Sequence, residues 1–362
     1  MGHFFGIDLL RLFAALLVVL FHLQAFGWSA PEFPADSAGA AFGGLAPYGW
    51  FGWVGVQIFF VISGLVIAAS ATGARPGDFL LRRATRVFPA LWAASVIALA
   101  VRASSGEPLG PLMGDFGRSV ILSPKGPYID GVVWTLVVEA AFYGLVALML
   151  AWRGPGLRLD RMAYVLGGAS ALFLLTHATA EALGWAGAER FDGFHFDVLL
   201  LRHGVFFGLG MLLWSMRSEG RSPARLGAAG LFAAMGMLQL SLYTQQGMAP
   251  VLPALTWGAA VIWILASLRW NDRLFRPSWG PAIRELGLLT YPLYLCHFTL
   301  GMYATPWLAS FLPGRGAVLA AVVALIALTS WLVMRGPERA LQRVARDALR
   351  RRAASRPVSA RP

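Results

Sequence analysis

Long apolar runs recur along almost the whole chain, and they limit its possible folds more than any other feature. An α-helix needs about 20 apolar residues to cross a bilayer. With 57% hydrophobic residues among 362 and a mean hydropathy of +0.63, these runs predict an all-α polytopic membrane protein of about ten transmembrane helices. The expected spans are residues 7–27, 50–70, 87–103, 131–152, 162–180, 198–216, 226–243, 251–268, 286–306 and 316–335.

Basic residues are distributed unevenly between the two sides that these spans define. If both termini lie on one side, that side carries 23 of the 30 Lys and Arg residues. Cytoplasmic segments of membrane proteins carry such an excess, so both termini are expected in the cytoplasm. Topology then explains the formal net charge of +12, and a nucleic-acid partner is not expected. The predicted division is a transmembrane domain over residues 1–335 and a cytoplasmic basic tail over 336–362, helical and lying on the inner leaflet.

The first apolar segment, from Gly6 to Leu23, carries ionisable side chains inside a predicted span. A charged group at the centre of a spanning helix costs roughly 3 kcal/mol on insertion scales. Arg11 and His22 are eleven residues apart, which brings them to one helix face about 16 Å apart along the axis. This face predicts a functional cation and imidazole. The alternative is an arginine that reaches the headgroups and a histidine at the opposite interface.

A cluster of arginines precedes the third span. Arg83 and Arg86 are three residues apart, so on a helix they share a face, with Arg82 beside them. Paired guanidiniums at the start of a span are suited to binding phosphates, because each planar group can donate to two oxygens. Simple positive-inside decoration is the alternative interpretation.

Further polar side chains fall inside other spans. Glu139 lies in the fourth span at a depth comparable to that of His22, and a Glu139–His22 pair would fix the imidazole tautomer; a protonated Glu139 in a packing hydrogen bond is the alternative. The second span contains Gln57 and Ser63, and its glycines are interpreted as packing positions. The ninth span and the start of the sixth supply Tyr291, Tyr294, His297, Arg202 and His203.

The remaining motifs exclude several classes of site. Cys296 is the one cysteine, so an internal disulfide is excluded, and no spacing typical of a metal site appears. A phosphate-binding glycine loop and a nucleophile elbow are also absent from the sequence. Buried ionisable groups with an arginine cluster at the inner side suit a transfer reaction with a phosphate-bearing donor. They also suit a proton-coupled small-molecule transporter, in which buried His and Glu act as relays.

Six motifs in register along the chain resemble acyltransferase family 3, whose integral membrane proteins O-acylate glycans, peptidoglycan or antibiotics. These motifs are Arg11 with ten residues to His22, GVQIFFVISG from Gly55, RATRVFP from Arg83, WTLVVE with Glu139, YPLYLCH with Tyr294 and His297, and GPERAL near the end. Gln57 stands where the second motif of this family usually has an acidic residue. Any role of that carboxylate in the family therefore cannot be assigned to this position.

The resemblance implies a bacterial inner-membrane enzyme that moves a short acyl group, most simply acetyl, from acyl-coenzyme A to a hydroxyl. The acceptor would be a glycan, a lipid-linked sugar or a secreted metabolite. His22 would act as general base or carry the acyl group, Glu139 would orient it, and Arg11 would hold the donor or polarise its carbonyl. Arg82, Arg83 and Arg86 would bind coenzyme A phosphates. The expected wall of the site comprises Gln57, Ser63, Tyr294, His297 and Arg202.

Overall fold

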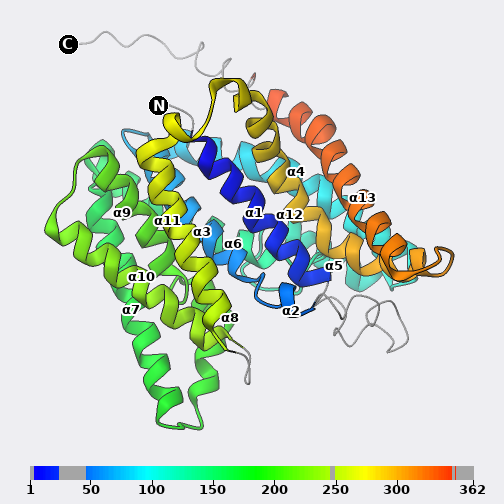
Figure 1. The fold of residues 1–362 in the computed structure, drawn as a ribbon, viewed down its shortest axis with the longest axis horizontal. Coiled ribbons are helices and arrows are strands. Elements are labelled where there is room, and N and C mark those ends of the chain that lie inside the picture. The colour runs from blue at the N-terminus through cyan, green and yellow to red at the C-terminus, as the bar shows by residue number, and fades with distance from the viewer. Residues whose placement is uncertain (1–3, 24–45, 245–248, 345–346, 348–362) are drawn as a thin grey trace.

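The computed structural model describes the chain except residues 1–3, 24–45, 245–248, 345–346 and 348–362 (Figure 1). The described part is all-helical and has no strand, as the apolar runs predict. Seven helices of this part are long and apolar enough to cross a membrane. Its α-helices are α1 (Phe5–Phe21), α2 (Ala46–Gly49), α3 (Val54–Ala71), α4 (Pro76–Ser104), α5 (Leu109–Val120), α6 (Val133–Arg153), α7 (Leu159–Ala182), α8 (Phe194–Val198), α9 (Gly204–Ser218), α10 (Pro223–Tyr243), α11 (Val251–Leu274), α12 (Gly280–Ala309) and α13 (Arg315–Val333).

Each of the ten expected spans overlaps one of the longer helices, but two boundaries differ in ways that affect the site. Helix α4 begins at Pro76, well before residue 87, because proline is favoured in the first turn of a helix. The arginine cluster therefore lies on α4 itself. The segment 104–130, expected as an outer loop, contains the amphipathic helix α5, which buries Leu112 against Ala98 and Ile129. The expected outer loop 28–49 lies mostly outside the described residues.

Helix α3 packs against α1 on one side and α9 on another, with backbones in close contact. Gly52, Gly55 and Gly64 make this approach possible, because a Cβ atom at any of them would lie 2.0–2.3 Å from a backbone carbonyl oxygen. That oxygen belongs to α1 for the first two glycines and to Phe207 of α9 for Gly64. The prediction that these glycines serve helix packing is confirmed.

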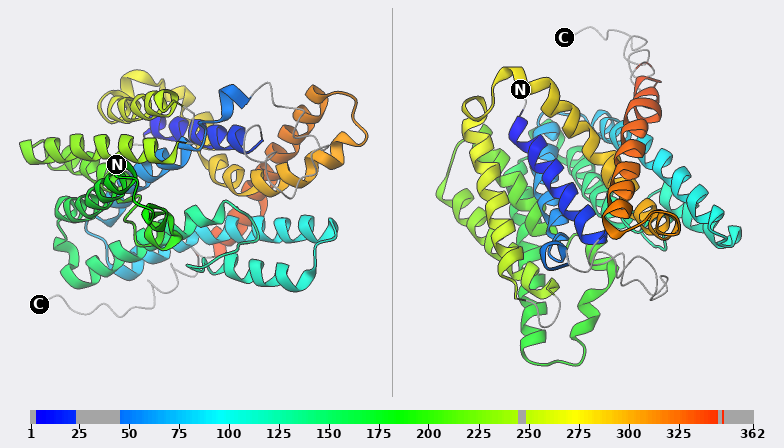
Figure 2. Two further views of the ribbon diagram at one scale, coloured as in Figure 1. Left: turned by 90° about the horizontal axis from the view of Figure 1, so that it is seen from below. Right: turned by 45° about the vertical axis from the view of Figure 1, so that its right-hand side comes forward.

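Helix α1 lies between α11 and α12 (Figure 1) and contacts both. Its contact with α12 is close at Gly287, where a Cβ atom would lie 2.7 Å from Asp8 Cγ. Asp8 also lies 3.8 Å from Arg11, one turn further along α1. The views in Figure 2 show α1 running along the bundle beside α12, so its two ends lie at different depths. This places Arg11 and His22 at two levels of the same interface.

A polar network joins α4, α5 and α12 at the end of the bundle that holds α5. Arg102 binds Glu107 at 2.7 Å, and Tyr303 of α12 donates to the same carboxylate. The hydrogen bonds from Arg102 hold the pKa of Glu107 below its usual value, so this carboxylate is charged at neutral pH. Nearby, the buried Asp130 accepts hydrogen bonds from the main-chain N–H and hydroxyl of Thr299. These contacts fix the register of α12 close to His297.

The segment after α13 continues the helix and packs against α4. A π-helical turn, Met334–Glu338, contains Pro337 and is followed by helical residues up to Val344. Glu338 is only 2% exposed, because it packs against α4. The first part of the predicted basic tail is thus docked on the transmembrane bundle, and most of the remainder lies outside the described residues.

Candidate active site

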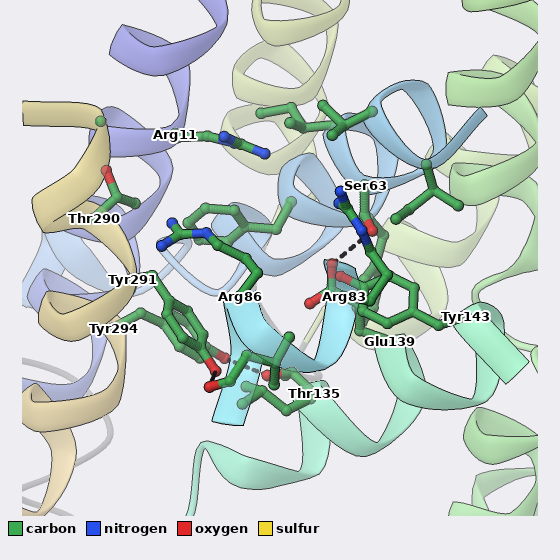
Figure 3. Close-up of a pocket in the computed structure, with 18 of the residues that line it drawn as sticks. Arg11, Ser63, Arg83, Arg86, Thr135, Glu139, Tyr143, Thr290, Tyr291 and Tyr294 are labelled. Atoms are coloured by element: carbon green, nitrogen blue, oxygen red, sulfur yellow. Dashed lines mark hydrogen bonds between the residues drawn. The ribbon is translucent and has the colours of Figure 1, made fainter. Parts of the chain in front are cut away.

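A cavity of about 660 Å³ opens between α1, α3, α4, α6 and α12, and Gln342 of the C-terminal segment reaches it. Apolar side chains of α3, among them Phe59 and Phe60, form part of the wall. The polar side chains that line it are Arg11, Ser63, Arg82, Arg83, Thr85, Arg86, Thr135, Glu139, Tyr143, Thr290, Tyr291, Tyr294 and Gln342. Figure 3 shows ten of them as labelled sticks that surround a common space.

Four arginines and one carboxylate, that of Glu139, are the charged groups among the described residues that line this cavity. Arg82, Arg83 and Arg86 come from the first turns of α4, and Arg11 comes from α1. The excess of guanidinium groups makes the cavity electropositive. In surroundings shielded from water such a site attracts a multiply charged anion strongly.

Arg86 is held from two sides. Its Nη1 donates to Glu338 Oε1 at 2.6 Å, and its guanidinium carbon lies 5.3 Å from the centre of the Tyr291 ring. Tyr291 in turn donates its hydroxyl hydrogen to the carbonyl of Val87 at 3.0 Å. These contacts fix the guanidinium at the edge of the cavity, and its remaining N–H groups are left for other acceptors.

Glu139 lies beside Ser63, Arg83 and Tyr143 (Figure 3). Ser63 of α3 donates to Glu139 Oε1 at 2.6 Å, which joins α3 to α6 inside the cavity. Two residues that the sequence places in separate spans therefore form one polar contact. The carboxylate also lies among the arginines, so it offsets part of their mutual repulsion.

Thr135 and Tyr294 lie at one end of the cavity. The Thr135 hydroxyl is 2.8 Å from the Tyr294 hydroxyl, so α6 and α12 are hydrogen-bonded there. The ring of Tyr294 also packs edge-on against Phe59 of α3, at 5.6 Å between centroids. Three helices thus meet at this end.

His22 and His297 lie near this end, outside the set of described residues that line the cavity. His22 Nδ1 is 2.9 Å from His297 Nε2, and His297 Nδ1 is 2.8 Å from the carbonyl oxygen of Tyr294. His297 is fully buried on α12. The two predicted histidines are therefore brought together, although they lie 275 positions apart in the sequence.

The structure brings most of the predicted site residues to one region. The cavity is lined by Arg11, Ser63, Arg82, Arg83, Arg86, Glu139 and Tyr294. The expected contact between Glu139 and His22 is replaced by two others, because Glu139 binds Ser63 and His22 binds His297.

Two residues expected in the wall lie elsewhere. Arg202 forms ion pairs with Asp197 at 3.2 Å and Asp192 at 3.5 Å, in the connection from α8 to α9. Gln57 is buried on α3, 2% exposed, and does not belong to the described lining of the cavity. For Gln57, position along the span indicates depth, whereas rotation of the helix decides which neighbour the side chain meets. Arg202 lies in the turn before α9 and not on the helix itself.

Sequence reasoning missed several residues of the site. Tyr143 follows Glu139 by four residues, and this spacing places both on one helix face. Glu338 belongs to the GPERAL motif and Thr135 to the WTLVVE motif, but the sequence indicated a partner for neither. Gln342 lay in the predicted basic tail.

Comparison with known proteins identifies the family. Residues 4–334 match the family described as Acyltransferase domain. Nodulation protein 10 of Rhizobium leguminosarum bv. viciae is 32% identical over 181 residues, which cover 42% of this chain and 46% of that protein. A Bacillus subtilis (strain 168) protein named as a peptidoglycan O-acetyltransferase, YrhL, is 25% identical over 336 residues, covering 83% of this chain and 49% of that protein.

The chain spans about half the length of both relatives. No solved structure matches it. The family match covers nearly the whole chain, and it includes five of the six motifs and the helices α1, α3, α4, α6 and α12 that line the cavity, while GPERAL follows directly after it. This chain belongs to the acyltransferase 3 family of membrane proteins.

Proposed function

We propose that this protein is a membrane-bound O-acyltransferase that moves a short acyl group, most simply acetyl, from acyl-coenzyme A to a hydroxyl acceptor. The observation that carries the proposal is the electropositive cavity. Four arginines line one part of it, and Thr135 and Tyr294 line another part, close to the two histidines. Coenzyme A has the matching shape, with phosphates at one end and the thioester at the other. Family membership favours the enzyme over a transporter.

The donor would enter from the cytoplasmic side. Arg82, Arg83 and Arg86 would bind its phosphates by charge-assisted hydrogen bonds, and the arm that carries the thioester would extend toward Tyr294. Arg11, inside the cavity, would hold the donor or polarise its carbonyl. Glu139 would keep Ser63 and the neighbouring arginines in position.

His22 would act as the general base on the acceptor hydroxyl. It lies about 16 Å along α1 from Arg11, so a donor held at the arginines would present its thioester at this level. The acceptor would approach from the opposite side of the membrane. A surface glycan, a lipid-linked sugar or a secreted metabolite fits this geometry, and the name of the Bacillus subtilis relative supports a glycan.

The transfer itself is tested with the purified protein in liposomes that contain radiolabelled acetyl-coenzyme A. A fraction of surface glycans and metabolites is supplied on the other side, and the labelled products are analysed by mass spectrometry. We expect label in an ester of the acceptor only when protein and donor are both present. Uptake of an intact small molecule without ester formation would contradict the proposal and favour a transporter.

We further propose that α1, α3, α4, α6, α7 and α9 to α13 all cross the bacterial inner membrane, with both termini in the cytoplasm. Residues 1–335 would form the transmembrane domain and 336–362 the cytoplasmic tail. The prediction is that cysteines introduced at Thr72 and Ser105, both exposed, label from opposite sides in a Cys296→Ala background. A membrane-impermeant thiol reagent applied to oriented vesicles measures this, and labelling from one side would contradict the ten-helix topology.

The donor prediction concerns Arg83. Arg83→Ala should weaken acetyl-coenzyme A binding about tenfold to a hundredfold, because a charge-assisted hydrogen bond contributes roughly 1.5–3 kcal/mol. Isothermal titration calorimetry measures the affinity. Arg75→Ala, an exposed arginine just before α4 and outside the cavity lining, is the matched control and should bind normally.

Arg86 needs a different design, because its removal would leave Glu338 buried without its cation. Such a half-pair destabilises a protein by roughly 3–5 kcal/mol. We therefore combine Arg86→Ala with Glu338→Gln, and expect a folded protein with reduced donor affinity. Normal affinity in both the Arg83 variant and this double variant would leave the arginines as topology signals alone.

A further inference from the structure

The pair of His22 and His297 defines where the hydrogens of both rings lie. His297 Nδ1 is 2.8 Å from the carbonyl oxygen of Tyr294. A carbonyl oxygen can only accept, so Nδ1 of His297 carries a hydrogen. His297 is fully buried in the bundle, where a charged imidazolium would be costly to desolvate, so the ring is neutral and its Nε2 carries a lone pair.

The same reasoning extends from His297 to His22. The lone pair on His297 Nε2 faces His22 Nδ1 at 2.9 Å, and a hydrogen bond forms only if His22 Nδ1 carries the hydrogen. The other nitrogen of His22, Nε2, is therefore left with a lone pair.

Neighbouring groups keep both rings in this arrangement. Phe298 packs edge-on against His22, with 4.9 Å between ring centroids, and Phe21 packs on it at 5.3 Å. On α12, Asp130 binds Thr299 two residues after His297. The orientation of His297 is thus fixed by its own helix and by the loop before α6.

We propose that His297 is a positioning residue for the acyl transfer: it accepts the Nδ1 hydrogen of His22 and so fixes the tautomer in which Nε2 of His22 takes the proton of the acceptor hydroxyl. This inference rests on the proposed function of His22 as general base. In the reaction, the acceptor hydroxyl gives its proton to Nε2 of His22 as its oxygen bonds to the acyl carbon. The C–S bond then breaks, and the coenzyme A thiolate takes up that proton.

This arrangement differs from the one expected from sequence, in which a carboxylate would orient the base. A carboxylate stabilises the imidazolium by its charge, whereas His297 is neutral and supplies an acceptor only. In an apolar bundle the neutral partner avoids the cost of a second buried charge. The contact with His297 thus sets the tautomer of His22.

The test compares His297→Phe with His297→Gln in single-turnover assays, with acetyl-coenzyme A affinity measured in parallel. Phenylalanine fills the space and cannot accept a hydrogen bond, so we expect turnover to fall at least about a hundredfold, with unchanged donor affinity. The glutamine side chain can place an amide oxygen near His22 Nδ1, so His297→Gln should retain turnover within about tenfold of the native protein. A His297→Phe protein that keeps its turnover, or a His297→Gln protein as slow as His297→Phe, would overturn the positioning role.

A double variant separates positioning from a structural role. If His297 acts only through His22, then adding His297→Phe to His22→Gln should not lower the residual rate further. A further hundredfold loss in the double variant would overturn the inference. Failure of the proposed function is distinct, because it would appear as full turnover in the His22→Gln protein itself.

Discussion

His22→Gln is expected to abolish acyl transfer while acetyl-coenzyme A still binds with normal affinity. A glutamine amide keeps part of the hydrogen bonding with His297 but cannot take a proton at neutral pH. General base catalysis contributes roughly a hundredfold to ten-thousandfold in rate, so single-turnover rates should fall by at least that factor. Donor affinity should persist, because the arginines proposed to bind the phosphates belong to α4 and line the cavity, whereas His22 lies outside its described lining.

The matched control is His177→Gln. His177 is also buried, but it lies on α7, outside the described cavity lining, with its Nε2 3.5 Å from Glu181 Oε1. This variant should keep its turnover. Near-normal turnover in the His22→Gln protein would show that His22 is a packing residue, and it would remove the central catalytic assignment made for this cavity.

Gly64→Ala is expected to destabilise the folded protein strongly. The added Cβ would lie 2.2 Å from the carbonyl oxygen of Phe207, and this oxygen belongs to the backbone of α9. Because a backbone cannot rotate away as a side chain does, α3 and α9 would have to separate. Overpacking typically costs about 1–3 kcal/mol, and a forced helix displacement should reach the upper end of that range or exceed it.

Thermal unfolding in detergent, followed by size-exclusion chromatography, measures this effect. Gly144→Ala on α6 is the control, since a Cβ at this helical position meets nothing within 4 Å. Alanine is also favoured over glycine inside a helix, so this variant should be as stable as the native protein or slightly more stable. Equal stability of the two variants would contradict the close contact between α3 and α9.

Much of the site could be predicted from the sequence because its signals are local. Arg11, Arg83, Arg86 and Glu139 are ionisable groups in or beside apolar runs, where burial is costly, and each was expected to have a function on that ground. In the structure, these four side chains line one cavity. The glycines of α3 were likewise predictable, since small residues in a spanning helix permit close packing.

The pairing of these groups could not be predicted. Glu139 was expected at the depth of His22, and nothing in the sequence indicates which of α6 and α12 turns its polar face toward the end of α1. The same holds for Arg86, whose partner Glu338 lies 252 positions later. Gln57 was expected in the wall for the same reason, that its depth was known and the rotation of α3 was not. Arg202 was expected inside a span, but it lies in the turn before α9.

The sequence by itself determined the all-helical fold, the approximate spans, the family motifs and the set of chemically active side chains. These depend on apolar length, helical periodicity and the energetic cost of buried charge, all of which are properties of short segments. Only the tertiary structure decided that His22 contacts His297 and that Glu139 contacts Ser63. Such contacts depend on how helices distant in sequence are rotated and shifted against one another, and that is set by the summed packing of the whole bundle, including the glycine contacts of α3.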